Sequence, residues 1–265
     1  MERIYRVGTR TSALALKQVE EAMDMLKRHY PDMQTEIIGI DTYGDKDRVT
    51  PISEIEGTDF FTREIDEALL KGEVDFAIHS AKDLADEPRK GLAIAAITDS
   101  INPYDALVSK YGSNLDKLPK GARIGTSSLR RKTQLKEYRK DFEIVDIRGN
   151  IEKRLRLLDN ELQAPEPDSD RRSEQIFRSP IGIGLDGIVI AACGLIRLGL
   201  SHRITQRIPL EILKPHPLQG SLAIVAKENN IELIELLSVV GTAHCAVPTN
   251  PSDSRSRTGK ALNKG

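Results

Sequence analysis

Hydrophobic and polar positions follow two different periods along the first 230 residues of the chain. Short β-branched runs, typical of buried strands, are separated by stretches in which apolar residues recur every three or four positions, as on one face of a helix. In the first of these stretches, Leu16, Val19, Met23 and Leu26 share one face. Regular alternation of strands and helices predicts an α/β fold, with mostly parallel sheets covered by helices.

The same pattern predicts the bounds of nine strands and five helices. The expected strands are Ile4–Gly8, Thr35–Ile40, Val74–His79, Leu92–Ile97, Ala106–Val108, Arg123–Thr126, Glu143–Ile147, Asp186–Ala191 and Leu222–Ala226. The expected helices are Ser12–Arg28, Phe61–Lys71, Ser128–Tyr138, Asn150–Asn160 and Cys193–Leu198.

Two interruptions of the alternation predict that the chain crosses twice between two lobes. One is SINPYD, near Ser100–Tyr104, and the other is the proline-rich stretch Ile208–Pro217. A length of 265 residues agrees with two lobes, since a domain has roughly 150 residues. We therefore expect one lobe from residues 1–99 and 208–230, and a second from residues 103–204 that carries a polar loop insertion at 162–185.

Charge and composition exclude several classes of partner. With 39 Lys+Arg against 40 Asp+Glu, the net charge of −1 gives no general attraction to nucleic acid or to an anionic membrane. The opening residues lack the apolar core of a secretory signal, and no apolar run approaches the length of a membrane span. Two cysteines are too few for a disulfide framework, and the five histidines show no metal-ligand spacing. We expect a cytoplasmic monomer without a bound metal, acting on a small molecule.

Three of the strand-to-helix junctions combine small or hydroxyl residues with arginine: GTRTS at 8–12, GTSSLRR at 125–131 and RGN at 148–150. The N-terminus of a helix carries the positive end of the helix dipole, so Arg130 and Arg131 are locally unfavourable there. A bound polyanion would remove this conflict, because the N–H groups, hydroxyls and guanidinium groups would all face it. Surface arginines beside water-capped helices are the alternative, and the spacing alone leaves both open.

A fourth junction differs in kind. The run VDFAIHSAKDLADE places Ser80, Lys82 and Asp83 just after the strand that ends at His79. A carboxylate beside a cation in a cleft can handle protons or stabilise a cationic intermediate. A solvated Lys–Asp pair on a loop is the alternative, and His79 is expected to pack or hydrogen-bond locally.

Six segments occur in one order over about residues 3–230: RVGTRTSALALKQ, FAIHSAKDL, IGTSSLRRKTQL, DIRGNIEKRLRLLDN, DGIVIAACGLIRLGL and PHPLQGSLAI. Together they resemble the porphobilinogen deaminase (hydroxymethylbilane synthase) family, and GTSSLRR followed by RGN is the most specific signal. The resemblance implies two lobes of mixed, mostly parallel sheet flanked by helices, of the type II periplasmic-binding-protein kind.

The resemblance also implies a reaction. The family's transferases condense porphobilinogen units head to tail, with loss of ammonia, to give hydroxymethylbilane in haem biosynthesis. A dipyrromethane cofactor, held by a thioether to a cysteine, primes the chain. Each pyrrole carries acetate and propionate groups, which is the kind of polyanion that the arginine-rich junctions would suit.

Roles for individual residues follow from the matching motifs. Asp83 matches the catalytic aspartate that holds pyrrole N–H groups and stabilises the cation formed as ammonia leaves. The carboxylate-binding positions are matched by Arg10, Ser12, Lys82, Arg130, Arg131, Arg148, Arg154 and Arg197. The polar or aromatic cleft positions are matched by Phe61, Ser80, Thr126, Ser127, Ser128 and Gln219.

Several segments depart from the family pattern. Members carry a third domain that holds the cofactor cysteine, whereas 35 residues follow Asn230 here. We therefore expect residues 231–265 to be a remnant of that domain with a disordered tail. Cys245, in HCAVP, is the candidate attachment residue, with an incidental thiol as the alternative; Cys193 is expected to pack as a small apolar residue. GTD at 57–59, Ala85 and Leu218 also replace family residues.

Three hypotheses follow from this sequence. The first is a working deaminase with a shortened cofactor region, supported by the full set of cleft residues. The second is a non-catalytic homologue that binds a pyrrole polycarboxylate. The third is a degenerate homologue that folds poorly because the absent domain leaves apolar surface exposed.

Overall fold

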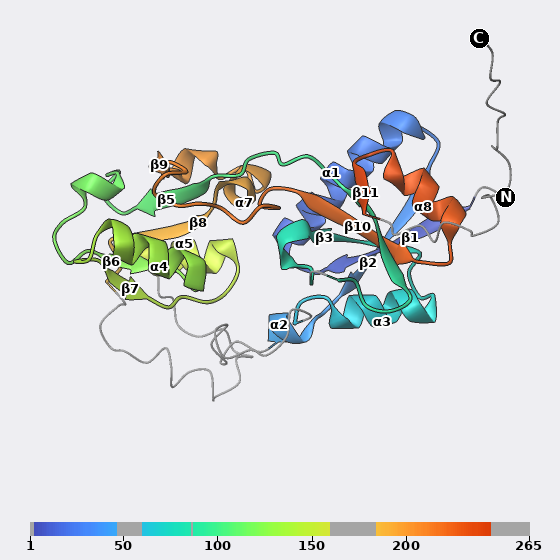
Figure 1. The fold of residues 1–265 in the computed structure, drawn as a ribbon, viewed down its shortest axis with the longest axis horizontal. Coiled ribbons are helices and arrows are strands. Elements are labelled where there is room, and N and C mark those ends of the chain that lie inside the picture. Colours follow the sequence, from blue (N-terminus) through green and yellow to red (C-terminus); the bar gives the residue numbers. More distant parts are fainter. Residues whose placement is uncertain (1–2, 47–59, 86, 160–183, 245–265) are drawn as a thin grey trace, which may run out of the picture.

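The computed structural model describes residues 3–46, 60–85, 87–159 and 184–244, and they form two lobes side by side along the longest axis of the molecule (Figure 1). The sheet of the first lobe has six strands, which in their order across the sheet are β11 (Thr242–His244), β4 (Leu92–Ile97), β10 (Leu222–Lys227), β3 (Phe76–Ser80), β1 (Ile4–Arg10) and β2 (Gln34–Ile40). β1 pairs in parallel with β2 and β3, whereas β10 is antiparallel to β3 and β4. The carboxyl ends of β1 and β3 therefore meet at one edge of the sheet.

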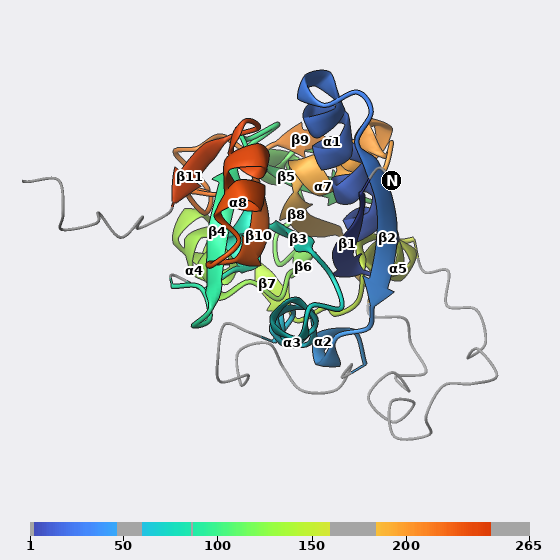
Figure 2. The same cartoon turned by 90° about the vertical axis from the view of Figure 1, so that its right-hand side faces the viewer.

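Helices cover both faces of this sheet (Figure 2). α1 (Ala13–His29) and α8 (Ile231–Ser238) share one core with Val7 and Phe76, while α3 (Arg63–Lys71) packs with Ala77 in a second core on the other face. A four-residue helix, α2 (Tyr43–Lys46), follows β2. The buried face of α1 is centred on Ala15, Val19, Ala22 and Leu26, so Leu16, which the periodicity assigns to the core, is 38% exposed.

The sheet of the second lobe has five strands, which in their order across the sheet are β7 (Glu143–Val145), β6 (Arg123–Gly125), β8 (Gly187–Ala191), β5 (Asp105–Ser109) and β9 (Gln206–Arg207). β6 is parallel to β7 and β8, and β5 is antiparallel to β8 and β9. α5 (Ile151–Leu158) and α7 (Ala192–Arg197) pack on one face, with Leu155 and Leu195 in a common core. α4 (Leu129–Tyr138) packs on the other face through Leu135.

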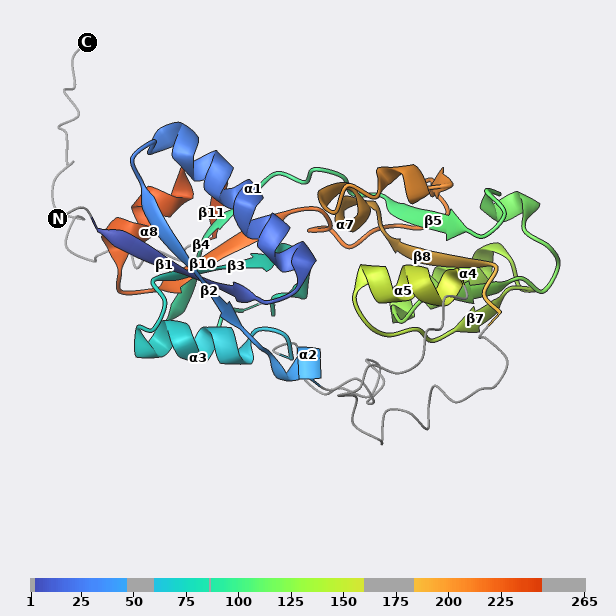
Figure 3. The same ribbon diagram turned by 180° about the vertical axis from the view of Figure 1, so that it is seen from behind.

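Two connections, from β4 to β5 and from β9 to β10, run between the lobes and are visible from both sides (Figures 1 and 3). They are hydrogen-bonded to each other: Ser100 Oγ donates to the carbonyl of Gln219 over 2.6 Å, and Gln219 Nε2 donates to the carbonyl of Pro103 over 2.6 Å. Gly220 has φ of 95°, and a Cβ there would lie 2.2 Å from Ser100 Oγ. The close approach of the two connections therefore requires a glycine at this position.

The mixed, mostly parallel α/β fold expected from the alternation is confirmed. In the described residues, four of the six strands of the first lobe and four of the five of the second point the same way. The structure adds α2, α8, β9 and β11, which the periodicity does not predict.

Residues 231–244 lie differently from the expected third-domain remnant. α8 places Leu233, Ile234 and Leu237 in the core of the first lobe, and β11 pairs with β4 at the edge of its sheet. This segment is therefore part of the first lobe, because its apolar residues complete a core that α1 alone leaves partly uncovered. Most of the expected loop insertion at 162–185, and the expected tail from residue 245 on, lie outside the described residues. None of the described helices has the length and apolarity needed to cross a membrane.

Candidate functional site

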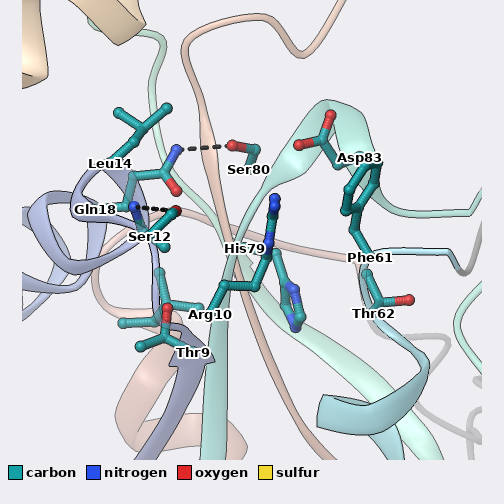
Figure 4. A pocket seen from close by; sticks show the side chains of 12 residues that line it. Thr9, Arg10, Ser12, Leu14, Gln18, Phe61, Thr62, His79, Ser80 and Asp83 are labelled. Carbon is teal, nitrogen blue, oxygen red and sulfur yellow. Dashed lines mark hydrogen bonds between the residues drawn. The ribbon is translucent and has the colours of Figure 1, made fainter. Parts of the chain in front are cut away.

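A pocket lies where β1 and β3 end, and we call it the β1–β3 pocket (Figure 4). Val7 and Gly8 of β1 pair with Phe76 and Ala77 of β3, so the residues that follow these pairs reach the carboxyl edge of the sheet together. The pocket is lined by Thr9, Arg10, Ser12, Leu14, Ala15, Gln18, Phe61, Thr62, Ile78, His79, Ser80 and Asp83. All of these belong to the first lobe, and five of them are site residues that the sequence analysis names.

Arg10 and Phe61 form the aromatic side of the pocket. The guanidinium carbon of Arg10 lies 4.5 Å from the centre of the Phe61 ring, a distance at which the ring face attracts a cation. Asp83 lines the same pocket from a 3-10 turn, Ala81–Asp83, that directly follows β3. A cation, a carboxylate and an aromatic ring thus converge on one space. Lys82 lies on the same turn but is not among the residues that line the pocket.

The first turn of α1 supplies the polar side of the pocket. Ser12 is the N-cap, and its Oγ accepts a hydrogen bond from the N–H of Ala15 over 3.3 Å. One turn further on, Gln18 Nε2 donates to Ser80 Oγ over 2.7 Å. The sequence analysis misses Gln18. Its position on the buried face of an amphipathic helix was the available signal, because a polar residue there needs a hydrogen-bonding partner.

His79 is also among the residues that line the pocket, and it is 5% exposed. Burial, together with the positive charge of Arg10, lowers the pKa of His79 to about 4, so the imidazole is neutral at pH 7. Within the described residues, its Nε2 atom has no hydrogen-bonding partner. His79 is thus packed locally, the first of the two environments expected for it, and Nε2 is not hydrogen-bonded within the described residues.

The second lobe gathers arginines around one buried carboxylate. Asp105, which is fully buried, accepts hydrogen bonds from Arg131 over 2.7 and 3.0 Å, from Arg130 over 2.8 Å and from Gln219 over 3.0 Å. We call these four residues the Asp105 cluster. Although burial by itself would raise it, the two guanidinium groups hold the pKa of Asp105 below its usual value. Arg130 and Arg131 are positive charges at the positive end of the α4 dipole. The negative charge of Asp105, a residue of the protein itself, compensates for this unfavourable placement.

Arg130 also donates to the carbonyl of Lys214, and Arg131 is 6% exposed. The sequence analysis names both arginines as ligand-binding residues but does not identify Asp105. Their role toward a ligand stays a prediction. The signal for Asp105 was its position at the end of SINPYD, where a connection between the lobes enters a strand.

Arg154 and Arg148 extend the positive charge of this lobe. Arg154 Nε donates to the carbonyl of Gly149 over 2.8 Å, and the preceding Asn150 caps α5 by accepting from the N–H of Lys153 over 2.9 Å. Burial and the like charges of Arg131 and Arg148 lower the pKa of Arg154 to about 10. Since nearby positive charges lower the pKa of Arg154, an anion bound here would stabilise its guanidinium group.

Arg197 has a different environment from the one expected for a ligand-binding residue. Its side chain is 4% exposed and forms a two-pronged ion pair with Glu21 of α1, over 2.7 and 2.9 Å. It also donates to the carbonyl of Gly220 over 2.8 Å. Arg197 therefore ties the second lobe to the first and to one of the connections between them.

The hydroxyl residues of the GTSSLRR junction support the backbone. Ser127 Oγ donates to the carbonyl of Ile147 over 2.7 Å, and Thr126, fully buried, accepts a weak hydrogen bond from the N–H of Ser128 over 3.4 Å. Ser128 is the N-cap residue of α4 but makes no side-chain capping bond. Among the hydroxyls of Thr126, Ser127 and Ser128, that of Ser128 is therefore the one without a hydrogen bond to the described backbone.

Cys245 and the segment 57–59 lie outside the described residues. Cys193 is buried in α7, as expected for a small apolar residue. Among the described residues, no group of three His, Cys, Asp or Glu side chains has an arrangement that could hold a metal ion.

Comparison with known proteins gives a consistent family match. The sequence model described as "Porphobilinogen deaminase, dipyromethane cofactor binding domain" matches residues 5–235. The chain is 42% identical over 235 residues to porphobilinogen deaminase of Natranaerobius thermophilus, covering 89% of this chain and 69% of that protein. It is 42% identical over 228 residues to the protein of the same name from Syntrophus aciditrophicus, covering 86% and 67%.

Solved structures resemble the chain more distantly. A reduced form of OxyR from N. meningitidis matches 89% of this chain and 93% of its own length, with a TM-score of 0.47 and 13% identity. The methionine-binding protein MetQ matches 88% and 89%, with a TM-score of 0.43 and 16% identity. The fold assignment accordingly depends on the strand order of the two sheets and not on these similarities.

Proposed function

Because the chain belongs to the porphobilinogen deaminase family, whose members are transferases of porphyrin synthesis, we propose that it condenses porphobilinogen units head to tail, with loss of ammonia, to give hydroxymethylbilane. The observation that carries this proposal is the convergence of Asp83, Arg10 and Phe61 on the β1–β3 pocket. Such a set can hold one flat, anionic ring that acquires positive charge during the reaction.

Asp83 has the central role in this proposal. When the C–N bond of the aminomethyl group breaks and ammonia leaves, the pyrrole becomes a cation. The Asp83 carboxylate would stabilise that charge as it develops, which is where a preorganised group helps most. The methylene carbon then bonds to the α-carbon of another pyrrole, and that carbon loses its proton.

The arginines would orient the substrate through its carboxylates. Arg10, held against Phe61, is suited to bind a carboxylate while the ring of Phe61 faces the pyrrole. Arg148, Arg154 and the two arginines of the Asp105 cluster would bind the carboxylates of further pyrrole units. The repulsion of Arg154 by Arg131 and Arg148 supports this role, because an anion would offset it.

The dipyrromethane cofactor of the family fits this donor chemistry. Its acetate and propionate groups would suit the same guanidinium groups, and Ser128 and Ser12 offer hydroxyls at helix starts. The group would supply the priming pyrroles, and we propose Cys245 as its attachment residue. The other residues named here bind and orient ligand without contributing covalent chemistry.

A second function is favoured by one observation. Asp105 already pairs with both Arg130 and Arg131 and offsets one of their two positive charges, so these arginines have a partner in the absence of ligand. A homologue that binds a pyrrole polycarboxylate in the first lobe, without condensation, would retain such an arrangement.

The intact mass of protein purified from a host that makes porphobilinogen separates these functions. An adduct of two pyrrole units that is lost in Cys245→Ser, with larger adducts after added porphobilinogen, is expected for a primed transferase. An unmodified mass in both samples would favour the binding function.

Consumption of porphobilinogen provides the second measurement. We expect Asp83→Asn to lower the rate by about 100-fold or more, since one preorganised charge at a transition state contributes that much. Asp32→Asn, on an exposed loop far from the pocket in sequence, is the matched control and should leave the rate unchanged. An equal rate for wild type and Asp83→Asn would contradict the assignment of Asp83.

A further inference from the structure

The four-residue helix α2 is held in place by the residues that lead into α3. A helix this short is not stable by itself in water, so contacts with other parts of the chain must fix it. The N–H of Gly44 donates to the carbonyl of Phe60 over 3.2 Å. The N–H of Tyr43 donates to the Oε1 atom of Glu64 over 3.0 Å. α2 and the start of α3 therefore lie side by side, as Figures 2 and 3 show.

Three aromatic rings connect α2 to the β1–β3 pocket. The rings of Tyr43 and Phe60 meet edge to face, with their centres 5.4 Å apart and their planes at 88°. The rings of Phe60 and Phe61 meet in the same way, at 5.0 Å and 90°. This is a preferred geometry, because the positive edge of one ring faces the negative face of the other. Phe61 in turn lies 4.5 Å from the guanidinium carbon of Arg10, so the row of contacts runs from α2 to a charged group of the pocket.

The backbone of α2 lies directly against the ring of Phe61. A Cβ atom at residue 44 would lie 2.3 and 2.4 Å from two carbons of the Phe61 ring and 2.7 Å from a carbon of Phe60. Carbon atoms in contact are about 3.5–4.0 Å apart, so no side chain fits between α2 and these two rings. Gly44 therefore allows the helix backbone to approach Phe61 closely and to limit the rotation of its ring.

The orientation of Phe61 matters because of what its ring faces. Phe61 and Arg10 are among the described residues that line the pocket, whereas Phe60 and Tyr43 are not. A guanidinium group is attracted by the face of an aromatic ring and not by its edge. If the ring of Phe61 turned about its side-chain bonds, its face would no longer lie against Arg10. The contacts of Phe60 and Gly44 with this ring therefore also influence where the guanidinium group lies.

We infer that Phe60 and Gly44 are positioning residues of the β1–β3 pocket. They hold the ring of Phe61 in the orientation in which its face attracts Arg10, and so place the guanidinium group for a substrate carboxylate. This inference rests on the proposed function, because it concerns the binding of that function's substrate. Neither residue touches the substrate. Their contribution to affinity is preorganisation, since a ring and a cation that are already fixed lose less freedom when a ligand binds.

Two substitutions test the two supports separately. Phe60→Leu keeps an apolar side chain but removes the ring that meets Phe61 edge to face. By calorimetry with porphobilinogen, we expect it to weaken binding about three- to tenfold. Gly44→Ala adds one methyl group, from which the ring of Phe61 must move away. We expect this displacement, which takes the ring from Arg10, to weaken binding about tenfold or more.

The side-chain resonances of Arg10 provide a readout that a merely structural role would not change. Protons held over the face of an aromatic ring are shifted upfield by its ring current. In NMR spectra of the ligand-free protein, Arg10 should show this shift, and its resonances are identified by their loss in Arg10→Lys. We expect the shift to become smaller in both Phe60→Leu and Gly44→Ala.

Tyr5→Leu is the matched control. Tyr5 lies at the other end of β1, where its ring contacts Phe76 at 6.5 Å and lies 4.8 Å from the guanidinium carbon of Arg3. The substitution therefore removes a ring from a similar set of two aromatic residues and an arginine, away from the pocket. It should leave both the affinity for porphobilinogen and the Arg10 shift unchanged.

The inference requires that affinity and the Arg10 shift decrease together in each variant whose thermal unfolding shows that it is folded. If Gly44→Ala does not fold, Phe60→Leu decides alone. Wild-type affinity in a folded variant, or weaker binding with an unchanged Arg10 shift, would overturn the inference and leave the proposed function standing. If the folded wild type neither binds nor consumes porphobilinogen, the proposed function fails and this inference fails with it.

Discussion

The β1–β3 pocket and the Asp105 cluster use buried polar groups in opposite ways. In the first lobe, His79 Nε2 has no hydrogen-bonding partner among the residues that the structure describes, and Asp83 and Arg10 line the same pocket. In the second lobe, Asp105 is fully buried and accepts four hydrogen bonds from Arg130, Arg131 and Gln219. The first lobe therefore buries a polar atom that its described residues leave unpaired, while the second lobe pairs its buried carboxylate from its own chain.

This difference has a consequence for stability. A buried carboxylate with several charge-assisted hydrogen bonds is costly to break, although assembling it contributes little net stability. An unpaired buried atom lowers stability by itself and gains only when a partner arrives. We therefore expect the second lobe to depend on its charges for folding and the first lobe to depend on its polar groups for binding.

Removing Asp105 should have the largest effect. Asp105→Ala would leave Arg131 buried and Arg130 partly buried without a counter-charge, and we expect a loss of about 3–5 kcal/mol in the free energy of unfolding. Urea unfolding followed by circular dichroism measures this loss. Glu20→Gln breaks the exposed pair between Lys17 and Glu20 and should cost less than about 1 kcal/mol. If both variants lost less than about 1 kcal/mol in the free energy of unfolding, the second lobe would not depend on the charge of Asp105 for its stability.

Acid should next reveal the buried neutral imidazole of the first lobe. The pKa of His79 is about 4 in the folded protein, and that of an ordinary histidine is about 6.5, so the unfolded chain binds a proton more readily between these values. The stability due to neutral His79 is present above pH 6.5 and is lost as the pH falls through 4. The total loss is roughly 3 kcal/mol.

Unfolding free energies of the wild type and His79→Leu, measured from pH 7.5 to pH 4.5, isolate this effect because the other titrating groups cancel. The wild type should lose stability relative to the variant as the pH falls. Parallel curves for the two proteins would show that His79 is protonated as easily in the fold as in the unfolded chain.

The ion pair between Arg197 and Glu21 should have the smallest of these effects. It joins the second lobe, through Arg197, to the first lobe, through Glu21. A double-mutant cycle with Arg197→Met and Glu21→Gln should give a coupling energy of about 1–2 kcal/mol. If Arg197 binds a substrate carboxylate instead, Arg197→Met would weaken porphobilinogen binding while Glu21→Gln would leave it unchanged. Equal effects of the two substitutions on stability, without an effect on binding, support the structural role.

Local sequence was sufficient for most of the order of elements. The expected strand Leu92–Ile97 agrees with β4 residue for residue, and the expected helix over 128–138 agrees with α4 to within one residue. These elements are determined by periodic burial of neighbouring residues, which can be read along the chain. The pairing of β1 with β3 then brings Arg10 and Asp83 to one pocket, since carboxyl ends of parallel strands meet at one edge.

Only the tertiary structure decided which polar groups are paired. Asp105 and Arg131 are 26 residues apart, Gln18 and Ser80 are 62 apart, and Glu21 and Arg197 are 176 apart. No periodicity links such positions, because a hydrogen bond depends on distances of about 3 Å that arise when separate elements pack. The sequence by itself determined where arginines and carboxylates stand along the chain. Packing decided that Asp105 would pair with two of the arginines, while Nε2 of His79 would be buried without a partner among the residues that the structure describes.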